Sequence, residues 1–351
     1  MNKKRVLSGI RANGRLHLGN YLGAVKGMLE LQNNLEYETF SIPRGNDLLR
    51  QLKTNQYDLF YMVADLHSIN VPYNPKGFQQ AVREVVLDYL AAGLDPQKCT
   101  LFIQSHVPEH VELSYLFSTT VTVARMLHLP TYKEKVKQHP ENVNMALLYY
   151  PVLMAADILA YKSNLVPVGD DQLPHLEVAR EIARKMNDTY GLDFPEPEQF
   201  KTKGSRVPSL TGEGKMSKSV EGSYINLTDD IKTIKKKLAA VPTDSGQGEK
   251  VPETGGVAAL LQLVELFQGF AKKEEYERQY VASGVQYRVL KEELTEAIYK
   301  ELEPIQERRS ELEKDKGKVD RIIEEGAKKA REVASQTLQE VKLAMGLIMI
   351  H

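Results

Sequence analysis

In the first part of the chain, short apolar runs alternate with longer segments in which apolar residues recur at helical spacing. We expect the runs to form strands and the longer segments to form helices. The expected strands cover residues 5–10, 57–64, 100–104 and 164–168, and the expected helices cover residues 19–35, 79–90, 111–123, 142–161 and 171–190. Strands that alternate with helices indicate βαβ units. The sequence therefore predicts an α/β fold with a doubly wound parallel sheet and a ligand at the carboxyl ends of its strands.

After residue 222 only helical spacing remains. Thr228 is expected to cap a first helix that places Ile231, Ile234 and Leu238 on one face. Further helices are expected over residues 256–270, 274–282, 287–314 and 319–345. The chain is thus predicted to contain an α/β domain, residues 1–222, and an all-helical domain, residues 223–351. The last helix is a candidate to pack back on the first domain.

Residues 36–56 fit neither pattern and have the character of an insertion between a helix and a strand. They exceed the roughly 2–6 residues of an ordinary connection between a helix and a strand. They include Pro43-Arg44-Gly45-Asn46, followed by the segment Asp47–Arg50. We expect a loop followed by a short helix.

The composition is that of two ordinary globular domains. The 351 residues are 42% hydrophobic and 26% charged, and the net charge is −1. Without a global basic field, a nucleic-acid site must be a local patch. The single cysteine, Cys99, excludes a disulfide framework and a cysteine-built zinc or iron–sulfur site. Since the start lacks the pattern of a signal peptide and no run is long enough to span a membrane, we expect a cytoplasmic protein without membrane contact.

Two motifs have the chemistry needed to hold a nucleoside triphosphate. The segment Gly14–Tyr21 places His17 and Gly19 where the first strand meets a helix, whose free amides favour an anion. The loop Lys215–Ser219 carries two lysines and two serines. A histidine at such a turn is more often a packed or solvated residue, and a single cluster of lysine and serine is usually a solvated loop. A third segment, Val168–Gln172, follows the last expected strand, where acidic residues often serve only as a helix cap.

In this order, the first two motifs resemble the HIGH and KMSKS signatures of the class I aminoacyl-tRNA synthetases. A narrower resemblance to bacterial-type tryptophanyl-tRNA synthetases is carried by residues 7–10, 19–24, 150–159 and 166–175, and extends to residues 304–308 and 325–327. It implies a Rossmann-like catalytic domain followed by a helical domain that binds the tRNA anticodon. It also implies activation of L-tryptophan by ATP with release of pyrophosphate, then transfer of tryptophan to tRNA(Trp).

The resemblance assigns roles to individual residues of this chain. The implied catalytic residues are His17, Asn20, Lys135, Lys215, Ser217 and Lys218. The implied ATP-binding residues are Arg11, Ala12, Asn13, Gly19, Asn20, Gly169, Asp170, Asp171, Val207, Lys215, Met216, Ser217, Lys218 and Ser219. The implied tryptophan-binding residues are Leu7, Gly9, His67, Tyr150, Met154, Asp157, Ile158, Val166, Val168 and Gln172.

Three of these assignments involve departures or alternatives. Asn20 replaces the second histidine of the HIGH signature, and Arg11 stands where many relatives have glutamine. Lys133 and Lys137 could take the place of Lys135 as the lysine of a mobile loop that reaches the phosphates.

Asp157 carries the argument for the amino acid. It lies within the apolar segment Leu153–Leu159, where an unpaired charge is expensive. A structural carboxylate paired with a basic residue or a helix end is an equal alternative on the residues alone. The resemblance implies instead that Asp157 accepts the indole N–H of tryptophan. Phenylalanine lacks this donor, and discrimination of this kind reaches about 10⁴–10⁵.

We expect no protein-held metal. Mg²⁺ should arrive with ATP, coordinated mainly by phosphates and water, and no zinc or iron–sulfur cluster is expected. His106 and His110 have metal-like spacing, but without a third partner such pairs bind a metal in roughly one case in ten.

The expected macromolecular partner is tRNA(Trp), and the resemblance implies a homodimer with tRNA bridging its subunits. Candidate basic faces of the helical domain are Lys232, Lys235–Lys237, Lys272–Lys273 and Arg308–Arg309. For any one of these clusters, a solvated helix face is an equal alternative.

Three other functions compete with this hypothesis. A tyrosyl-tRNA synthetase shares the fold, although the context of Asp157 favours tryptophan. A non-catalytic paralogue that binds tRNA or senses tryptophan would be expected to have lost His17, Lys215 or Lys218, which are intact. A small-molecule nucleotidyltransferase would share the histidine turn but has no need for the helical domain.

Overall fold

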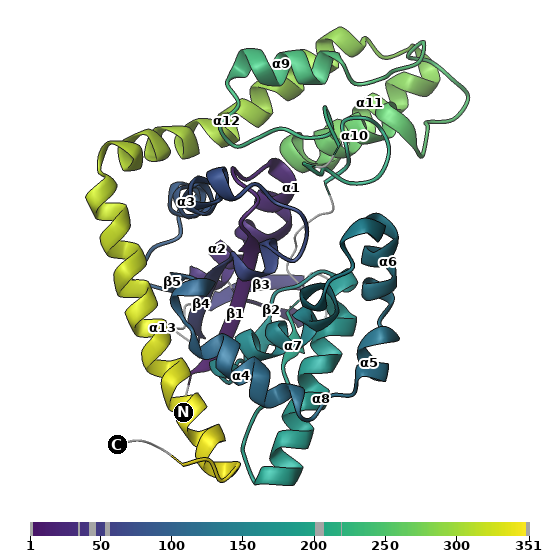
Figure 1. Cartoon of the computed structure of the whole chain (residues 1–351). Helices are drawn as coiled ribbons and strands as arrows, with labels where there is room; N and C mark the ends of the chain where they lie inside the picture. The colour runs from purple at the N-terminus through teal and green to yellow at the C-terminus, as the bar shows by residue number, and fades with distance from the viewer. Residues whose placement is uncertain are drawn as a thin grey trace.

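A five-stranded parallel sheet forms the centre of the computed structural model, which describes residues 3–33, 36–41, 47–52, 57–200, 207–218 and 220–348 (Figure 1). The strands lie in the order β5-β4-β1-β6-β7. Their bounds are β1 Lys4–Arg11, β4 Tyr57–Ala64, β5 Thr100–Ile103, β6 Leu165–Val166 and β7 Glu198–Gln199. Every pair in this sheet is parallel, with Val6 of β1 opposite both Leu59 and Leu165. The predicted fold class is confirmed, and the four predicted strands are present, although β6 has only two residues.

Alternate residues of the central strands enter two separate cores, one on each face of the sheet. Val6 and Leu59 pack on one face, whereas Leu7 and Phe60 pack on the other. Helices therefore cover both faces, as the alternating pattern predicted. The helical segments of this region are α1 Leu18–Asn20, η1 Tyr21–Val25, α2 Lys26–Gln32, η2 Leu66–Ser68, α3 Pro75–Ala92, η3 Gln104–His106, α4 Glu109–Ser118, α5 Val123–Leu127, α6 Pro130–Gln138, η4 Pro140–Asn142, α7 Met145–Ala160, η5 Asp170–Gln172 and α8 Leu173–Tyr190.

The region from residue 36 to 56 contains strands where we expected a loop and a short helix. β2 (Glu36–Ser41) pairs antiparallel with β3 (Asp47–Leu52), with Glu36 opposite Leu52. The prediction of a short helix is wrong. Pro43-Arg44-Gly45-Asn46 lies between the two strands, and such a cluster is typical of a hairpin connection. A hairpin also lets the two segments satisfy each other's backbone groups.

Helices α9 Ile231–Ala239, α10 Gly255–Gln268, α11 Phe270–Ala282, α12 Tyr287–Lys314 and α13 Lys316–Ala344 follow. The N-cap of α9 is Asp230, whose carboxylate accepts from Thr233 N at 2.8 Å, so the prediction of Thr228 as the cap is wrong. An ionised side chain is a stronger acceptor at a helix start. The division into two domains at residue 222 stays a prediction. No helix of the described residues is long and apolar enough to cross a membrane.

We call the part before residue 222 the α/β region and the part after it the helical region. The last helix, α13, leaves the other helices of the helical region and runs along the α/β region (Figure 1). Ala330 and Ala334 are fully buried, and Thr337 Oγ1 donates to Ala160 O at 2.7 Å. Gly326 faces β5 so closely that a Cβ there would lie 1.7 Å from Leu101 O. Small residues thus let the backbone of α13 approach the sheet.

We predict that Gly326→Ala lowers the free energy of unfolding by about 1–3 kcal/mol, because the helix must move away from β5. Gly317→Ala is the matched control on the same helix, since a Cβ there would meet Asp315 Oδ1 at an ordinary 3.7 Å. It should stabilise the protein slightly, by less than about 1 kcal/mol. Urea unfolding measures both, and equal stability of the two variants would contradict the packing described here.

Candidate active site

The candidate site begins where β1 ends. The loop from Ala12 to Leu16 leads into α1, and His17 is the N-cap residue of that helix. Leu18 N donates to Ile225 O at 2.9 Å, and Leu227 N donates to Leu16 O at 3.0 Å. Residues from the two predicted domains therefore share backbone hydrogen bonds on both sides of His17.

The side chain of His17 is buried, and one of its ring nitrogens is not hydrogen-bonded within the described residues. Within the described residues, His17 Nδ1 has no hydrogen-bond partner. Burial, and then the positive charge of Lys218, lower the pKa of His17 to about 4, so the ring is neutral at pH 7. A Cβ at Gly19 would lie 2.8 Å from His17 Cε1, so glycine is required where the ring rests on the helix. Asn20 Oδ1 accepts from His17 N at 3.2 Å and thereby helps to close the turn.

The second signature loop is anchored under this turn. Met216 is buried, its N donates to Val207 O at 3.1 Å, and its Cβ would lie 3.3 Å from a Cβ at Gly19. Ser223 Oγ donates to Ser217 O at 2.6 Å. Ser219, which the sequence assigned to ATP, lies outside the described residues.

Lys218 joins the two signatures directly. Its Nζ donates to Asn13 O at 2.7 Å and lies beside Gly14, where a Cβ would be 3.7 Å away. The side chain is half-buried, and burial lowers the pKa of Lys218 to about 8 although Asp88 and Glu84 oppose this change. The lysine of one motif thus closes over the loop of the other, beside a histidine with a free ring nitrogen.

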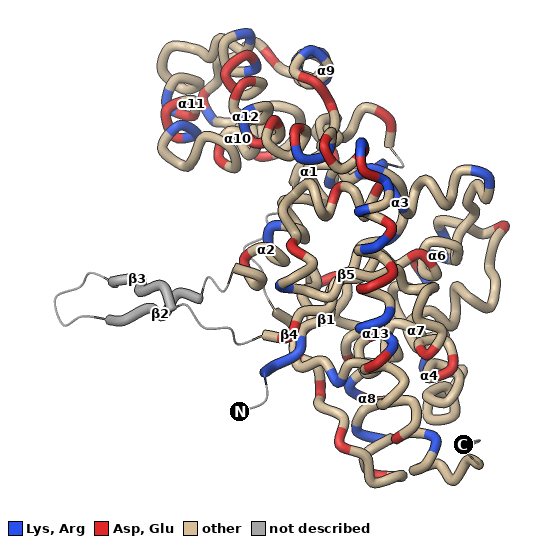
Figure 2. The backbone as a smooth tube through the Cα atoms, turned by 90° about the vertical axis from the view of Figure 1, so that its left-hand side faces the viewer, with Lys and Arg blue, Asp and Glu red and all other residues tan. Residues whose placement is uncertain are grey.

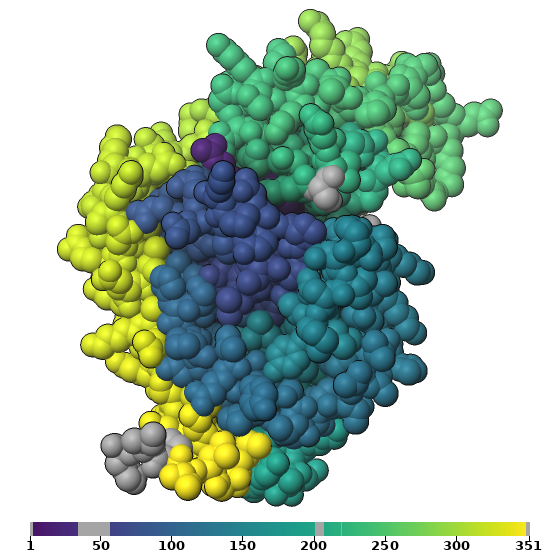
Figure 3. All heavy atoms as spheres, in the orientation of Figure 1, coloured from purple at the N-terminus to yellow at the C-terminus, as the bar shows by residue number. Residues whose placement is uncertain are grey.

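Further positive charge gathers at the same place. Lys135 lies on α6, a helix that the sequence analysis missed, and it is half-buried whereas Lys133 and Lys137 are exposed. Burial lowers the pKa of Lys135, and the charges of Arg11 and Lys215 lower it further. Three cations that repel one another are expected where a polyanion binds. In the surface view, α6 and the helical region face each other across a recess (Figure 3).

A chain of polar contacts leads from the third segment towards the core. Gly169 precedes η5, and a Cβ there would lie 2.7 Å from Asp171 Oδ1. Gln172 contacts Asp171 Oδ2 at 3.0 Å and His175 Nδ1 at 2.9 Å, and His175 Nε2 contacts the Tyr150 hydroxyl at 2.8 Å. This series of contacts connects Asp171, which was assigned to ATP, with Gln172 and Tyr150, which were assigned to tryptophan.

Asp170 and His175, in the segment 166–175, make contacts that the sequence analysis did not predict. Asp170 Oδ1 accepts from Gln199 Nε2 at 3.0 Å, a contact to the short strand β7 that the sequence did not predict. His175 was not predicted as a site residue, although it stands in the quoted segment 166–175. Burial lowers the pKa of His175 to about 4, so its ring is a neutral link between Gln172 and Tyr150.

Asp157 is 1% exposed and surrounded by donors. Gln104 Nε2 lies 2.9 and 3.0 Å from its two oxygens, His67 Nε2 lies 2.7 Å from Oδ2, and His110 Nδ1 lies 2.8 Å from Oδ1. Burial would raise the pKa of Asp157, but the contacts with His110 and His67 outweigh it and hold the pKa well below its usual range. The carboxylate is therefore ionised, and its partners are one amide and two imidazole side chains rather than a lysine or arginine.

His110 belongs to this group and not to a metal pair. Its Nε2 lies 2.7 Å from the Tyr161 hydroxyl and the ring is fully buried, whereas His106 is exposed. Within the described residues, no group of three His, Cys, Asp or Glu side chains is placed to hold a metal ion.

The apolar residues assigned to tryptophan belong to one hydrophobic core. Leu7, Ile158 and Val166 are buried in one core, and Met154 and Val168 are partly buried against it. A Cβ at Gly9 would lie 2.9 Å from Met62 O, so β1 passes close to β4 there. The assigned residues are thus brought together on one face of the sheet.

The sequence is similar to those of known proteins along most of its length. Residues 46–303 match the family described as tRNA synthetases class I (W and Y). The tryptophan–tRNA ligase of Porphyromonas gingivalis is 38% identical over 347 residues, which cover 97% of this chain and 98% of that protein. The tryptophan–tRNA ligase of Synechocystis is 40% identical over 359 residues, which cover 99% of each chain.

Solved structures give the same result. The structure of tryptophanyl-tRNA synthetase from Campylobacter jejuni, complexed with ADP and tryptophan, superposes with a TM-score of 0.80 at 30% identity and covers 98% of this chain and 100% of that one. A tyrosyl-tRNA synthetase from Archaeoglobus fulgidus shares the fold, with a TM-score of 0.64 at 19% identity. The chain belongs to the class I tRNA synthetases of the tryptophan and tyrosine family, and the curated relatives compared above are tryptophan–tRNA ligases.

Proposed function

We propose that this chain is a ligase that activates L-tryptophan with ATP, releases pyrophosphate, and transfers tryptophan to tRNA(Trp). The observation that carries the proposal is the contact between Lys218 and Asn13, which brings both signatures around the unsatisfied His17. The relatives named tryptophan–tRNA ligase support the choice of amino acid.

In this mechanism the protein supplies position and charge, because the carboxylate of tryptophan is itself the nucleophile that attacks the α-phosphate. His17 is neutral and can hydrogen-bond a phosphate oxygen without titrating near pH 7. Lys135, Lys215 and Lys218 stabilise charge on the departing pyrophosphate, which grows in the transition state. Mg²⁺ would travel with ATP, held mainly by phosphates and water.

For the amino acid, we propose that the indole N–H donates to Asp157. Both oxygens of Asp157 already have donors, so one partner must give way. His67 is the partner that can, because its side chain is 11% exposed whereas that of His110 is fully buried. Phenylalanine would leave the carboxylate without its new donor and would be rejected strongly.

The helical region would bind tRNA through α9, which carries blue basic positions in Figure 2. Lys232 and Lys236 of this helix are exposed. The other predicted basic faces are less available. Lys272 and Lys273 pair with glutamates, and the prediction of Arg309 as part of a tRNA-facing patch is wrong because this residue is 3% exposed.

Pyrophosphate exchange tests the proposed function. We expect exchange that depends on tryptophan and not on tyrosine, and a loss of about 10²–10³-fold in kcat for Lys218→Ala. Lys250→Ala, at an exposed lysine of the helical region, should leave exchange unchanged. Equal exchange with tyrosine would favour a tyrosyl enzyme, and no exchange with either amino acid would favour a non-catalytic paralogue.

A pH profile tests the role of Lys218 separately. Because the pKa of Lys218 is lowered to about 8, its positive charge is lost as the pH rises through that value. We expect kcat/KM for ATP to decline above about pH 8. In Lys218→Arg the charge persists, so this alkaline decline should disappear. An unchanged alkaline decline in Lys218→Arg would show that another group titrates there.

We also propose a homodimer that covers the apolar residues exposed on α4, α5 and the start of α7. Tyr115, Val123 and Met145 are 71%, 65% and 74% exposed, and large exposed apolar side chains are typical of surfaces that a partner covers. Sedimentation should give a dimer for the native chain and a monomer for Val123→Asp. Val281→Asp, at an exposed valine of α11, should remain dimeric. A native monomer at micromolar concentration would contradict this proposal.

A further inference from the structure

Arg309 of α12 is buried between the helical region and the α/β region. Its guanidinium pairs with Asp88 and Glu84 of α3, and its Nε donates to Glu313 Oε1 at 2.9 Å. The neighbouring Arg308 Nε donates to Ala91 O at 2.6 Å, also on α3. The end of α12 is therefore fixed to α3 through arginine side chains.

The same two carboxylates also hold the nucleotide turn. Asp88 Oδ2 accepts from Leu16 N at 2.5 Å, and Glu84 Oε2 accepts from Arg15 Nε at 2.9 Å. These residues come directly before His17 in the chain. Each carboxylate thus contacts Arg309 and the turn at the same time.

Asp88 depends on these contacts to remain ionised. It is fully buried, and burial raises the pKa of Asp88 to about 6, whereas Arg309 and the Leu16 amide act in the opposite direction. A buried carboxylate that loses its cation is strongly unfavourable. Asp88 and Glu84 also lie close enough to Lys218 to favour its charged form. The two carboxylates therefore interact with both signature motifs, by hydrogen bonds to Leu16 and Arg15 and by charge with Lys218.

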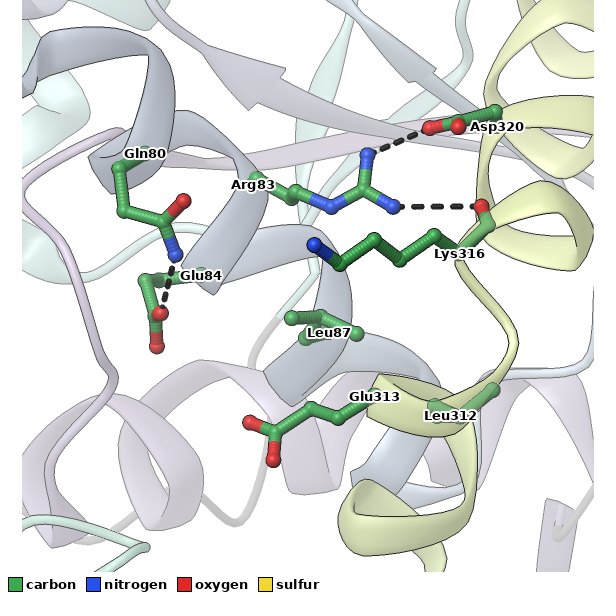
Figure 4. A pocket seen from close by; sticks show the side chains of 8 residues that line it. All are labelled: Gln80, Arg83, Glu84, Leu87, Leu312, Glu313, Lys316 and Asp320. Atoms are coloured by element: carbon green, nitrogen blue, oxygen red, sulfur yellow. Dashed lines mark hydrogen bonds and ion pairs between the residues drawn. The ribbon is translucent and has the colours of Figure 1, made fainter.

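A cavity of about 400 Å³ lies next to these contacts, between α3 and the junction of α12 with α13 (Figure 4). Glu84 of α3 and Glu313 of α12 both line it, and Arg83 bridges it by pairing with Asp320 and donating to Lys316 O at 3.2 Å. Because Arg83 is already paired with protein groups, it is not available to bind an anion in this cavity. Apart from Leu87 and Leu312, the residues that line the cavity are polar or charged.

We infer that Arg309 is a positioning residue that couples the placement of α12 to the nucleotide-binding turn. Through Asp88 and Glu84 it holds Leu16 and Arg15, and so keeps His17 where the phosphates of ATP bind. A shift of the helical region, such as tRNA binding could cause, would reach the ATP site by this route. The inference rests on the proposed function for the identity of the ligand.

The test compares four variants of the full chain with the native protein: Arg309→Met, Asp88→Asn, the double variant, and Arg288→Met. Arg288 is the matched control because it is an exposed arginine on the same helix. The readouts are the dissociation constant for Mg-ATP without amino acid, the KM values for ATP and tryptophan in exchange, and the melting temperature.

We expect Arg309→Met to weaken ATP binding by about five-fold or more, with the KM for tryptophan changed much less. Asp88→Asn in the same chain should restore most of the affinity, because asparagine needs no cation and its oxygen still accepts from Leu16 N. Arg288→Met should match the native protein.

Two outcomes would overturn the inference. In one, Arg309→Met lowers the melting temperature but leaves ATP affinity intact, as for a purely structural residue. In the other, the double variant binds ATP no better than Arg309→Met, so that Asp88 does not transmit the effect. If Arg309→Met does not fold, Arg309→Lys replaces it, since a lysine cannot hold both carboxylates and should still weaken ATP binding. A native chain that binds ATP but exchanges no pyrophosphate would refute the proposed function and leave this test in place.

Discussion

The proposed tryptophan site depends on one constraint, which is the negative charge of Asp157 buried in an apolar helix. Asp157 lies in the last turn of α7, and the cost of burying its charge is offset by Gln104, His67 and His110. Gln104 and His67 follow the ends of β5 and β4, which are neighbouring parallel strands. Because such strands end at one edge of the sheet, their following residues converge there. The fold thereby assembles three donors from separate segments around one carboxylate.

A second buried carboxylate, Asp88, serves the other face of the sheet. There the partner is a permanent cation, Arg309, and the group it orients is the backbone before His17. The contrast between the two acids has a physical reason. An arginine satisfies a structural carboxylate permanently, whereas a partly exposed histidine such as His67 can be exchanged for a ligand's donor.

Much of this arrangement could be predicted from the sequence. The alternation of apolar runs with helical spacing gave the parallel sheet, since strands buried on both faces are nearly continuous in apolar residues. Helix α12 begins and ends where its apolar spacing predicted. The grouping of His17 with Lys218 was implied by the resemblance of their two motifs to the HIGH and KMSKS signatures. Their assigned roles in catalysis stay predictions.

Other features depend on contacts between distant residues and carried no local signal. Arg309 stands beside Arg308 in a charged helix, and only the approach of α3 distinguishes a buried brace from a solvated face. His110 was considered with His106 because of spacing, yet its environment is set by Asp157 and Tyr161, roughly fifty residues away. The hairpin β2–β3 had a local signal in its turn residues, but it was outweighed by the expectation of a helix.

The proposed hydrogen bond from the indole N–H to Asp157 can be tested with an isosteric analogue of tryptophan. In the benzothiophene analogue of tryptophan, sulfur replaces the N–H while the ring keeps nearly the same shape. We expect its kcat/KM in pyrophosphate exchange to fall at least about a hundredfold below that of tryptophan, because nothing then replaces the hydrogen bond that His67 gives up. Equal kcat/KM for the two amino acids would show that Asp157 does not accept the indole N–H.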